Sequence, residues 1–461
     1  MYDAWTEHPA DDLDSMVLQP LVTPEYEQNP GAVHERLRGI YGPVAPIDLA
    51  GVPAWLVLGY QESLSVLRAP GDLWSKSAAH WRWYAQGRVP QDWPFLGTYL
   101  SSTMGQQEGP GHLELRTAWT AALKPFQDLS HPQAQLLERQ ITRYADQLID
   151  VMADGGPSGW ADLASQYARP LPLMVATRLL GFDSRRGEEV VMDCWRLFDD
   201  SPEAPAAFTR LYSAMAELAI GKREQPGDDL PSYLIAAKPD ISDDQLAREL
   251  LMMPMLHYLA ASLICNVVVA MVTNADVRST LSTGTIKETV NRAALLSPPT
   301  PSLPFRFPKM NVRMGRFTIA AGDPVMVCVA GAHADPWFGG IAGGRSTQST
   351  RAHLAWGAGH HGCLGARLAS TIATIGVQRL VTRLSHLQLA MPADQLPWGG
   401  TPYLRGLRSL PVQFETAAGF VRASASGPAP VVARRQEPEP PADSKLWNFL
   451  RGLRLRRNAR L

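Results

Sequence analysis

One cysteine lies where its surroundings suit a ligand to a metal. Cys363 ends a glycine-rich run that began at Trp356 and directly precedes a stretch with helical periodicity. A thiolate binds metals better than a thiol does, and the N–H groups at a helix start lower the pKa of a cysteine. The glycines in the run are Gly357, Gly359 and Gly362, and Gly365 follows the cysteine. The first three would let the backbone approach a flat ligand, and the last removes a side chain where the helix would press on it.

Two other interpretations of this run stay open. His353, His360 and His361 could bind zinc together with Cys363, although they lack the paired spacing of structural zinc sites. Cys363 could also be a buried structural cysteine, with the histidines as ordinary polar residues. The other cysteines, at positions 194, 265 and 328, are widely spaced and form no C-x-x-C pair. The spacing therefore indicates no disulfide framework and fits a reducing compartment.

The cysteine run resembles the ligand signature of the cytochrome P-450 family. Its spacing is aromatic-Gly-x-Gly-x-His-x-Cys-x-Gly followed by Ala-x-Leu-Ala, with Trp356 where the family has Phe. The resemblance covers about residues 30–418. It implies haem b (iron protoporphyrin IX) as the cofactor, with Cys363 bound to the iron. It also implies that Trp356, Gly357 and Gly365 lie beside the cofactor.

The same resemblance assigns four residues to the haem propionates. His112 and Arg116 are four positions apart, so they share one face of a predicted helix, as two cations meeting one carboxylate would need. Arg306 precedes predicted strands and corresponds to the family's strand arginine. His361 stands two residues before the cysteine, where the family places another propionate ligand. Taken alone, a His-x-x-x-Arg pair on a helix more often marks a solvated face.

The predicted central helix departs from the family. The family has Ala-Gly-x-Asp/Glu-Thr there, and its acid and alcohol deliver protons to bound oxygen. In the register set by residues 262–266, Met255 and Leu256 stand at the Ala-Gly positions, and Tyr258 and Leu259 replace the acid and the alcohol. We therefore expect an altered proton relay at these catalytic positions.

Two further family features are altered. The closest match to the family's Glu-x-x-Arg pair is Glu288 and Arg292, spaced by four, which could still pair on a helix. If the following Ser-Pro-Pro run sets the register instead, Asn291 and Ala294 hold the family positions and the ion pair is lost. Residues 338–345, with their four glycines, replace the family's Pro-Asp-x-Phe-Asp-x-x-Arg segment. The two changes suggest that one network was replaced as a unit.

The elements that would position these residues are mostly helices. Helical periodicity dominates residues 111–296, and strand-like alternation marks residues 44–58 and 312–329, with weaker strands near 410–414. We expect a mainly α fold with a small β region: the cytochrome P-450 fold, as a single large domain over residues 31–418.

The stretch from Leu250 to Val272 contains no charged residue and is long enough to span a bilayer. It also contains His257, Ser262 and Asn266, which are unfavourable in lipid. We therefore expect the buried central helix of a soluble protein.

The ends of the chain differ from the predicted domain. Residues 1–30 read as an N-terminal extension without the basic start or apolar stretch of a signal peptide, which predicts a cytoplasmic location. Residues 419–443 read as a Pro-rich linker. Residues 444–461 form a basic amphipathic tail. Its apolar face predicts contact with a membrane surface or a protein partner, and hence a peripheral location. That face comprises Leu446, Phe449, Leu450 and Leu453.

These features together predict a haem-thiolate monooxygenase. It would activate O2 to oxidise a hydrophobic small molecule, with electrons from a separate ferredoxin-type donor. The alternative is a non-catalytic or peroxide-using haem protein that acts as a sensor or scaffold, which the altered relay favours. The formal net charge of -1 and the pI near 6.8 indicate no nucleic-acid partner.

Overall fold

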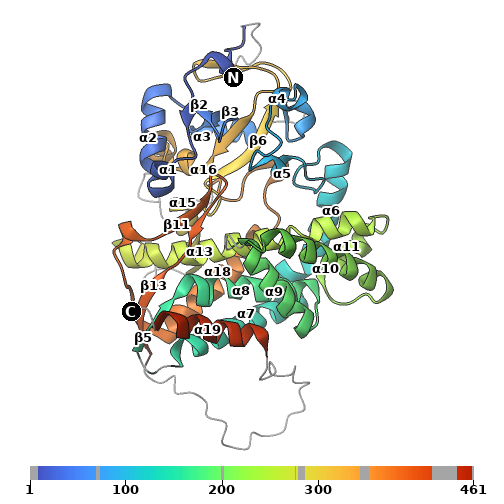
Figure 1. The fold of residues 1–461 in the computed structure, drawn as a ribbon, viewed down its shortest axis with the longest axis vertical. Coiled ribbons are helices and arrows are strands. Elements are labelled where there is room, and N and C mark those ends of the chain that lie inside the picture. The colour runs from blue at the N-terminus through green and yellow to red at the C-terminus, as the bar shows by residue number, and fades with distance from the viewer. Residues whose placement is uncertain are drawn as a thin grey trace, which may run out of the picture.

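The largest sheet and most of the long helices occupy different ends of the molecule (Figure 1). The computed structural model describes residues 9–68, 73–154, 156, 158–198, 202–275, 277–278, 286–342, 352–417 and 444–458. The largest sheet and the N-terminal helices lie at one end, and the long helices form the larger part at the other. This arrangement is the mainly α fold with a small β region that the sequence predicts.

Most of the long helices lie in or beside residues 111–296, where the sequence shows helical periodicity, and another follows Cys363 as predicted. They are α6 Gly109–Gln127, α7 Pro132–Ala153, α8 Pro170–Leu180, α9 Ser184–Phe198, α10 Ala204–Glu224, α12 Asp243–Leu250, α13 Met253–Thr273, α15 Ile286–Leu296 and α18 Ala366–Arg383. The other described helices are α1 Pro24–Gln28, α2 Pro30–Tyr41, α3 Tyr60–Arg68, α4 Arg82–Ala85, α5 Leu96–Tyr99, α11 Leu230–Ala237, α16 Val329–His333, α17 Pro336–Ala342 and α19 Lys445–Asn458.

The largest sheet has six strands in the order β1-β2-β3-β9-β6-β4. Their bounds are β1 Gln19–Pro20, β2 Val44–Asp48, β3 Pro53–Val57, β9 Val325–Cys328, β6 Ser302–Pro308 and β4 Trp74–Ser75. Both strands predicted within residues 44–58 are present. Strand β1 and helix α1 come from the predicted N-terminal extension, so part of that extension adds an edge strand to the domain.

Strand β6 explains how one arginine is directed away from an aromatic core. Phe305 and Phe307 are fully buried, and the rings of both lie 5.6 Å from that of Trp81. Because side chains alternate along a strand, Arg306 points to the opposite face. Arg306 is also buried, with 7% of its surface exposed.

Smaller sheets complete the β region. They are β10-β13-β5, formed by Leu384–Leu389, Pro411–Thr416 and Ser158–Asp162, the hairpin β11-β12, formed by Trp398–Thr401 and Leu404–Leu407, and the hairpin β7-β8, formed by Val312–Met314 and Phe317–Ile319. The sequence predicted the β7-β8 region and β13 but missed the other strands of these sheets.

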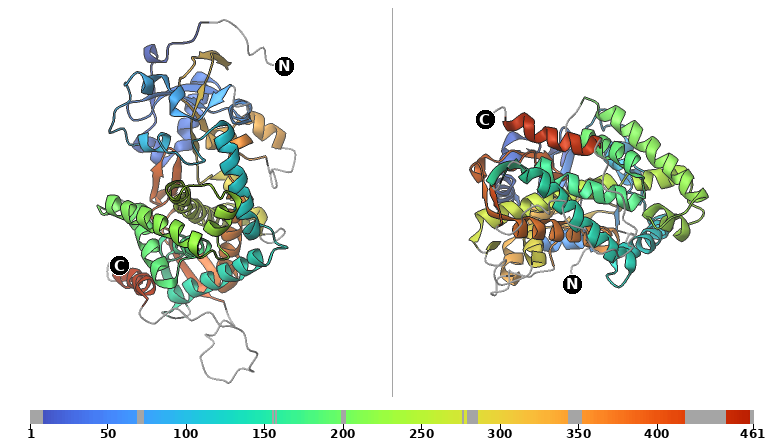
Figure 2. Two further views of the ribbon diagram at one scale, coloured as in Figure 1. Left: turned by 90° about the vertical axis from the view of Figure 1, so that its right-hand side faces the viewer. Right: turned by 90° about the horizontal axis from the view of Figure 1, so that it is seen from below.

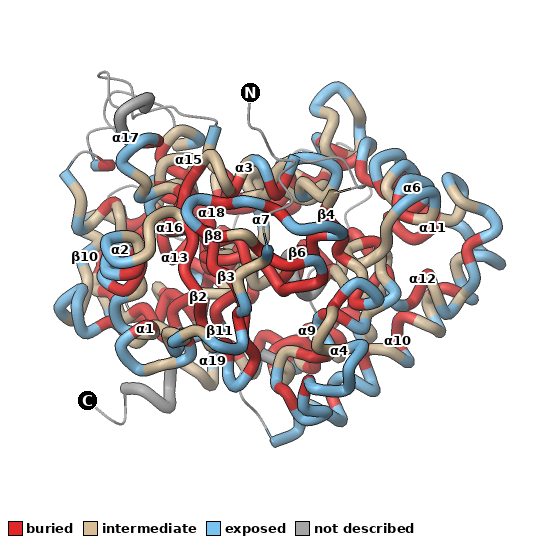
Figure 3. The backbone as a smooth tube through the Cα atoms, turned by 90° about the horizontal axis from the view of Figure 1, so that it is seen from above, coloured by how far each residue is buried: buried red, intermediate tan, exposed pale blue. Residues whose placement is uncertain are grey.

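The predicted central helix is interrupted. It consists of α12 and α13, which are separated at residues 251–252 because Pro254, in the first turn of α13, has no N–H to continue the ladder. Figure 3 shows α13 and the strands of the sheet among the buried parts of the backbone. Among the helices that the structure describes, none has the length and apolar character needed to cross a membrane.

The C-terminal tail is packed onto the domain. Figure 2 shows α19 on the outside of the helical part, and it contacts α7 and α9. Leu446, Trp447 and Leu450 are buried, and the ring of Phe449 lies 5.4 Å from that of Trp195. These residues include three of the four that the sequence assigns to a membrane or partner surface. The expectation of a free amphipathic tail is therefore corrected, since its apolar face completes the core. The predicted linker lies outside the described residues.

We expect Leu450→Ala to lower stability by about 2 kcal/mol, near the low end for a buried leucine, because α19 lies at the edge of the molecule. Only 1% of the Leu450 surface is exposed. The measurement is urea unfolding, with Arg451→Ala on the exposed side of the same helix as the control. Equal midpoints for the two variants would mean that α19 leaves the domain in solution, as membrane contact would require.

Candidate functional site

The loop before α18 is held by its own backbone. The Cys363 N–H donates to the Trp356 carbonyl oxygen at 2.8 Å. Gly357 and Gly359 adopt φ values of 69° and 67°, which side chains disfavour. Cys363 thereby lies two residues before Gly365, which caps the N-terminus of α18.

One of these glycines has a purpose that the sequence did not predict. A Cβ atom at Gly359 would lie 2.2 Å from the carbonyl oxygen of Leu67 in α3. The missing side chain lets the cysteine loop pack against α3, so the protein's own packing requires a glycine at position 359.

The environment of Cys363 contains opposing influences on its pKa. Burial raises the pKa of the thiol, while the backbone N–H groups of Gly365 and Ala366 and the charge of Arg116 lower it. The helix-start donors predicted from the sequence are present, but burial outweighs them. The Cys363 side chain is surrounded by protein yet exposed to an internal space. A positive charge in that space would favour the thiolate.

That space is a cavity of about 260 Å³ between the central helix and the cysteine loop. Met252, Met253 and Leu259 line it from the central helix, and Cys363 and Gly365 line it from the loop. Trp356 also lines it. The cavity is therefore apolar on the helix side and has a single thiol on the other.

Basic residues line one part of the cavity. His112, Arg116 and His361 are all there, as the sequence predicts, and the rings of the two histidines lie 4.1 Å apart. Lys76 lines the same part and was missed. Burial and neighbouring cations lower the pKa of both histidines, so they are neutral at pH 7.

Arg306 lies close enough to act on this group, because its charge contributes to the lowered pKa of His361. Within the described part of the chain, Lys76, Arg116 and Arg306 form no ion pair within 4.0 Å. The buried Nε2 of His112 also has no hydrogen-bond partner there. Buried charges are normally paired. Two cations and a thiol in the lining of one cavity, with Arg306 acting on His361 beside them, thus fit a flat anionic ligand that carries a metal.

Tyr258 and Leu259, the two altered positions of the central helix, face different surroundings. Leu259 lines the cavity. Tyr258 faces β12 instead: a Cβ atom on Gly406 would lie 3.0 Å from its hydroxyl oxygen and 2.6 Å from that of Ser262. Burial raises the pKa of Tyr258. The side chains of Met255 and Leu256 lie outside the described ones.

Helix α15 is tied to the cysteine loop by an amide. The Asn291 Oδ1 lies 2.7 Å from the Nε2 of His353. This contact engages the residue that the Ser-Pro-Pro register places at the family's acidic position. Glu288 and Arg292 lie on the same helix, and residues 343–345 of the altered segment lie outside the described ones.

The zinc interpretation finds no support. Across the described residues, no three side chains of His, Cys, Asp or Glu gather as they would around a metal ion. His353 instead bonds to Asn291, and His360 is exposed. The four candidate ligands therefore do not form one zinc site.

Known proteins resemble the chain over most of its length, although no protein-family model matches it. Cytochrome P-450 107B1 of Saccharopolyspora erythraea is 30% identical over 382 residues, which cover 79% of this chain and 90% of the relative. The 2-hydroxy-5-methyl-1-naphthoate 7-hydroxylase of Streptomyces carzinostaticus is 29% identical over 394 residues, 82% of this chain and 93% of the relative. The solved structure of CYP154A1 from Streptomyces coelicolor A3(2) is 29% identical, with a TM-score of 0.71, and covers 86% of this chain and 99% of that one.

Proposed function

The chain belongs to the cytochrome P-450 family of haem-thiolate monooxygenases, and on that premise we propose that Cys363 binds the iron of haem b. The observation that carries the assignment is the cavity, which brings this thiol together with Lys76 and Arg116, and neither of these cations forms an ion pair within 4.0 Å among the described residues. The relatives named as hydroxylases and monooxygenases favour an enzyme over the sensor or scaffold alternative.

The haem propionates are anions, which suits the basic lining of this cavity. We assign them to His112, Arg116, Arg306 and His361. Arg306 supplies its charge from β6 and Arg116 from α6, so the two cations fix the cofactor from separate elements. The haem, when bound, supplies an iron at which O2 is reductively activated, and the thiolate's electron donation favours O–O cleavage.

The residues of the central helix that line the cavity determine which molecules can approach the haem. Met252, Met253 and Leu259 give the cavity an apolar wall that excludes water and suits a hydrophobic substrate. Leu259 has no group that could donate or hold a proton, so protons must come by another route.

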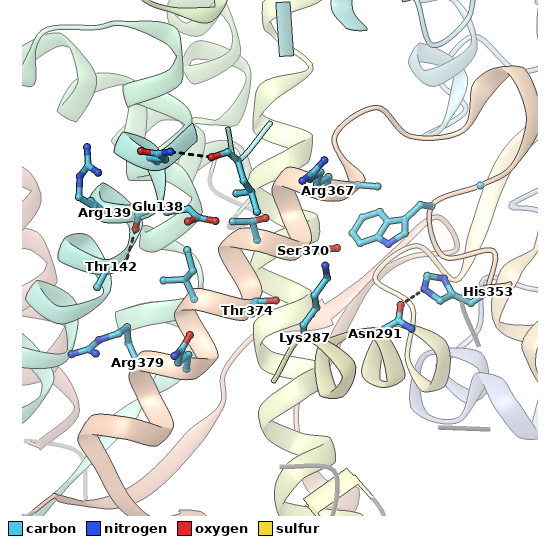
Figure 4. Close-up of a pocket in the computed structure, with 18 residues that line it drawn as sticks. Glu138, Arg139, Thr142, Lys287, Asn291, His353, Arg367, Ser370, Thr374 and Arg379 are labelled. Carbon is cyan, nitrogen blue, oxygen red and sulfur yellow. Dashed lines mark hydrogen bonds between the residues drawn. The ribbon is translucent and has the colours of Figure 1, made fainter. Parts of the chain in front are cut away.

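Electrons would enter from the opposite side of the cysteine loop. A groove of about 1040 Å³ lies there between α7, α15 and α18, and Trp356 lines both this groove and the haem cavity (Figure 4). Its charged lining residues are Glu138, Arg139, Lys287, Arg367 and Arg379. Arg379 is paired with Asp146 at 2.8 Å, and the remaining three cations still outnumber the one lining acid, which suits an acidic ferredoxin-type donor.

The test of the proposed function is turnover with isotope-labelled O2. The purified holoprotein would receive NADPH, a surrogate ferredoxin with its reductase, and 2-hydroxy-5-methyl-1-naphthoate as the hydrophobic probe, since a relative's name includes it. We expect a shift of the haem spectrum and one labelled oxygen in the product. A spectral shift without labelled product by any electron source would support a binding protein and contradict a monooxygenase.

A further inference from the structure

Lys76 is a buried cation that the family resemblance does not assign. Only 8% of its surface is exposed, and it lines the haem cavity together with His112, Arg116 and His361. It follows β4, the edge strand that pairs with β6. A lysine is rarely this buried unless its charge is paired.

The sheet register brings Lys76 beside Arg306. Strand β4 is antiparallel to β6, and Ser75 pairs with Phe307. Continuing this register by one residue places Lys76 opposite Arg306, where side chains share one face of the sheet. Like charges at opposite positions repel each other. The repulsion of the two cations calls for an anion between or beside them.

Glu108 supplies part of that compensation. Its carboxylate accepts hydrogen bonds from the Lys76 backbone N–H and, at 2.7 Å, from the Ser75 hydroxyl. Glu108 directly precedes α6, which carries His112 and Arg116. It therefore ties the segment after β4 to the helix with the predicted propionate ligands. Burial lowers the pKa of both Lys76 and Arg306, and the negative charge of Glu108 opposes that shift by favouring their charged forms.

The charges of the site then match the cofactor. Lys76, Arg116 and Arg306 contribute three positive charges when protonated, and Glu108 contributes one negative charge. The net charge of two positive units equals, with opposite sign, that of two ionised propionates. Without Lys76 the site would fall one positive charge short.

We propose that Lys76 is a further haem-propionate ligand and that Glu108 orients its segment and sets the charge of the site. The inference rests on the proposed placement of the propionates beside Arg306. It assigns to the β4 edge strand a positioning role that none of the sequence motifs marks.

The test measures two properties of the holoprotein: the rate of haem transfer to excess apomyoglobin and the reduction midpoint potential. Lys76→Met should speed haem loss by about 10- to 100-fold, as expected for a lost charge-assisted hydrogen bond. It should also lower the potential, because a nearby positive charge favours the reduced iron. Glu108→Gln should raise the potential, and the double variant should return close to the wild type. Lys76→Arg should retain haem.

Two control variants separate the outcomes. Lys124→Met removes an exposed lysine of α6 and should change neither property. If Lys76→Met behaves like Lys124→Met while Arg306→Met releases haem, the role of Lys76 is refuted and the propionate placement stands. If Arg306→Met also retains haem, the placement itself is wrong. If Lys76→Met and Glu108→Gln shift the potential in the same direction, the charge balance is refuted.

Discussion

Replacing Cys363 with alanine should abolish the thiolate-type Soret band of the reduced carbon monoxide complex. Cys363 is the one cysteine among the residues described as lining the haem cavity. Burial raises the pKa of Cys194 and Cys265 to about 12 and that of Cys328 to about 11, so these three remain neutral thiols at pH 7. Because none of these three lines the cavity, no other cysteine can replace the lost ligand.

The matched control is Cys265→Ala, which removes a buried thiol from α13 without touching the loop. It should retain the haem and the thiolate-type spectrum. If haem content and spectrum are unchanged in the Cys363 variant, Cys363 is not the iron ligand. A histidine-type spectrum already present in the wild type would refute the assignment as well.

The second prediction with a large expected effect concerns the supply of protons during O2 activation. Reductive activation of O2 consumes protons as well as electrons, and general acid catalysis typically contributes about 10²–10⁴-fold. Leu259 cannot donate a proton, and the raised pKa of Tyr258 makes its hydroxyl a poor acid at pH 7. We expect NADPH-driven turnover to be slow or poorly coupled, with the loss visible as NADPH consumed without product.

Hydrogen peroxide provides the comparison, because it arrives already reduced and protonated. Using the same probe, we expect peroxide to give more product than NADPH with the surrogate donor. Leu259→Thr, which restores an alcohol at this position, should raise coupling, whereas Leu259→Val, of similar size without the hydroxyl, should not. Fast, tightly coupled NADPH turnover in the wild type would show the register or its interpretation to be wrong. Absence of product by both routes would favour the sensor or scaffold alternative.

The cysteine site was predictable because its signal is local. The loop spacing identified Cys363, and the spacing of four placed His112 and Arg116 on one helix face, which the cavity then brings together with His361. Lys76 could not be found in this way. It reaches the site only through pairing between β4 and β6, which are more than two hundred residues apart in the chain, and nothing in its local sequence marks that pairing.

The sequence missed some strands for a similar reason, namely that their partners are distant in the chain. Strand β5 is short and has exposed residues, and it pairs with β13 near the end of the domain. Its neighbours in the sequence do not indicate that partner. For the C-terminal tail, the sequence predicted the element but not its partner. The amphipathic pattern of residues 446–453 indicated a helix with an apolar face, and such a pattern does not reveal which surface covers that face. Here that surface is the chain's own α7 and α9.

The residues that line the haem cavity are far apart in the sequence, and this separation affects when the cavity forms during synthesis and folding. The lining extends from Lys76 to Leu368, so the segments before α6 are synthesised long before Cys363 leaves the ribosome. Contacts between distant segments form late, because the chain must first lose the entropy of closing large loops. Until then, the cations have neither their final positions nor their anions. We expect cofactor capture to be among the last folding events, so that haem supply would limit the yield of folded protein during expression.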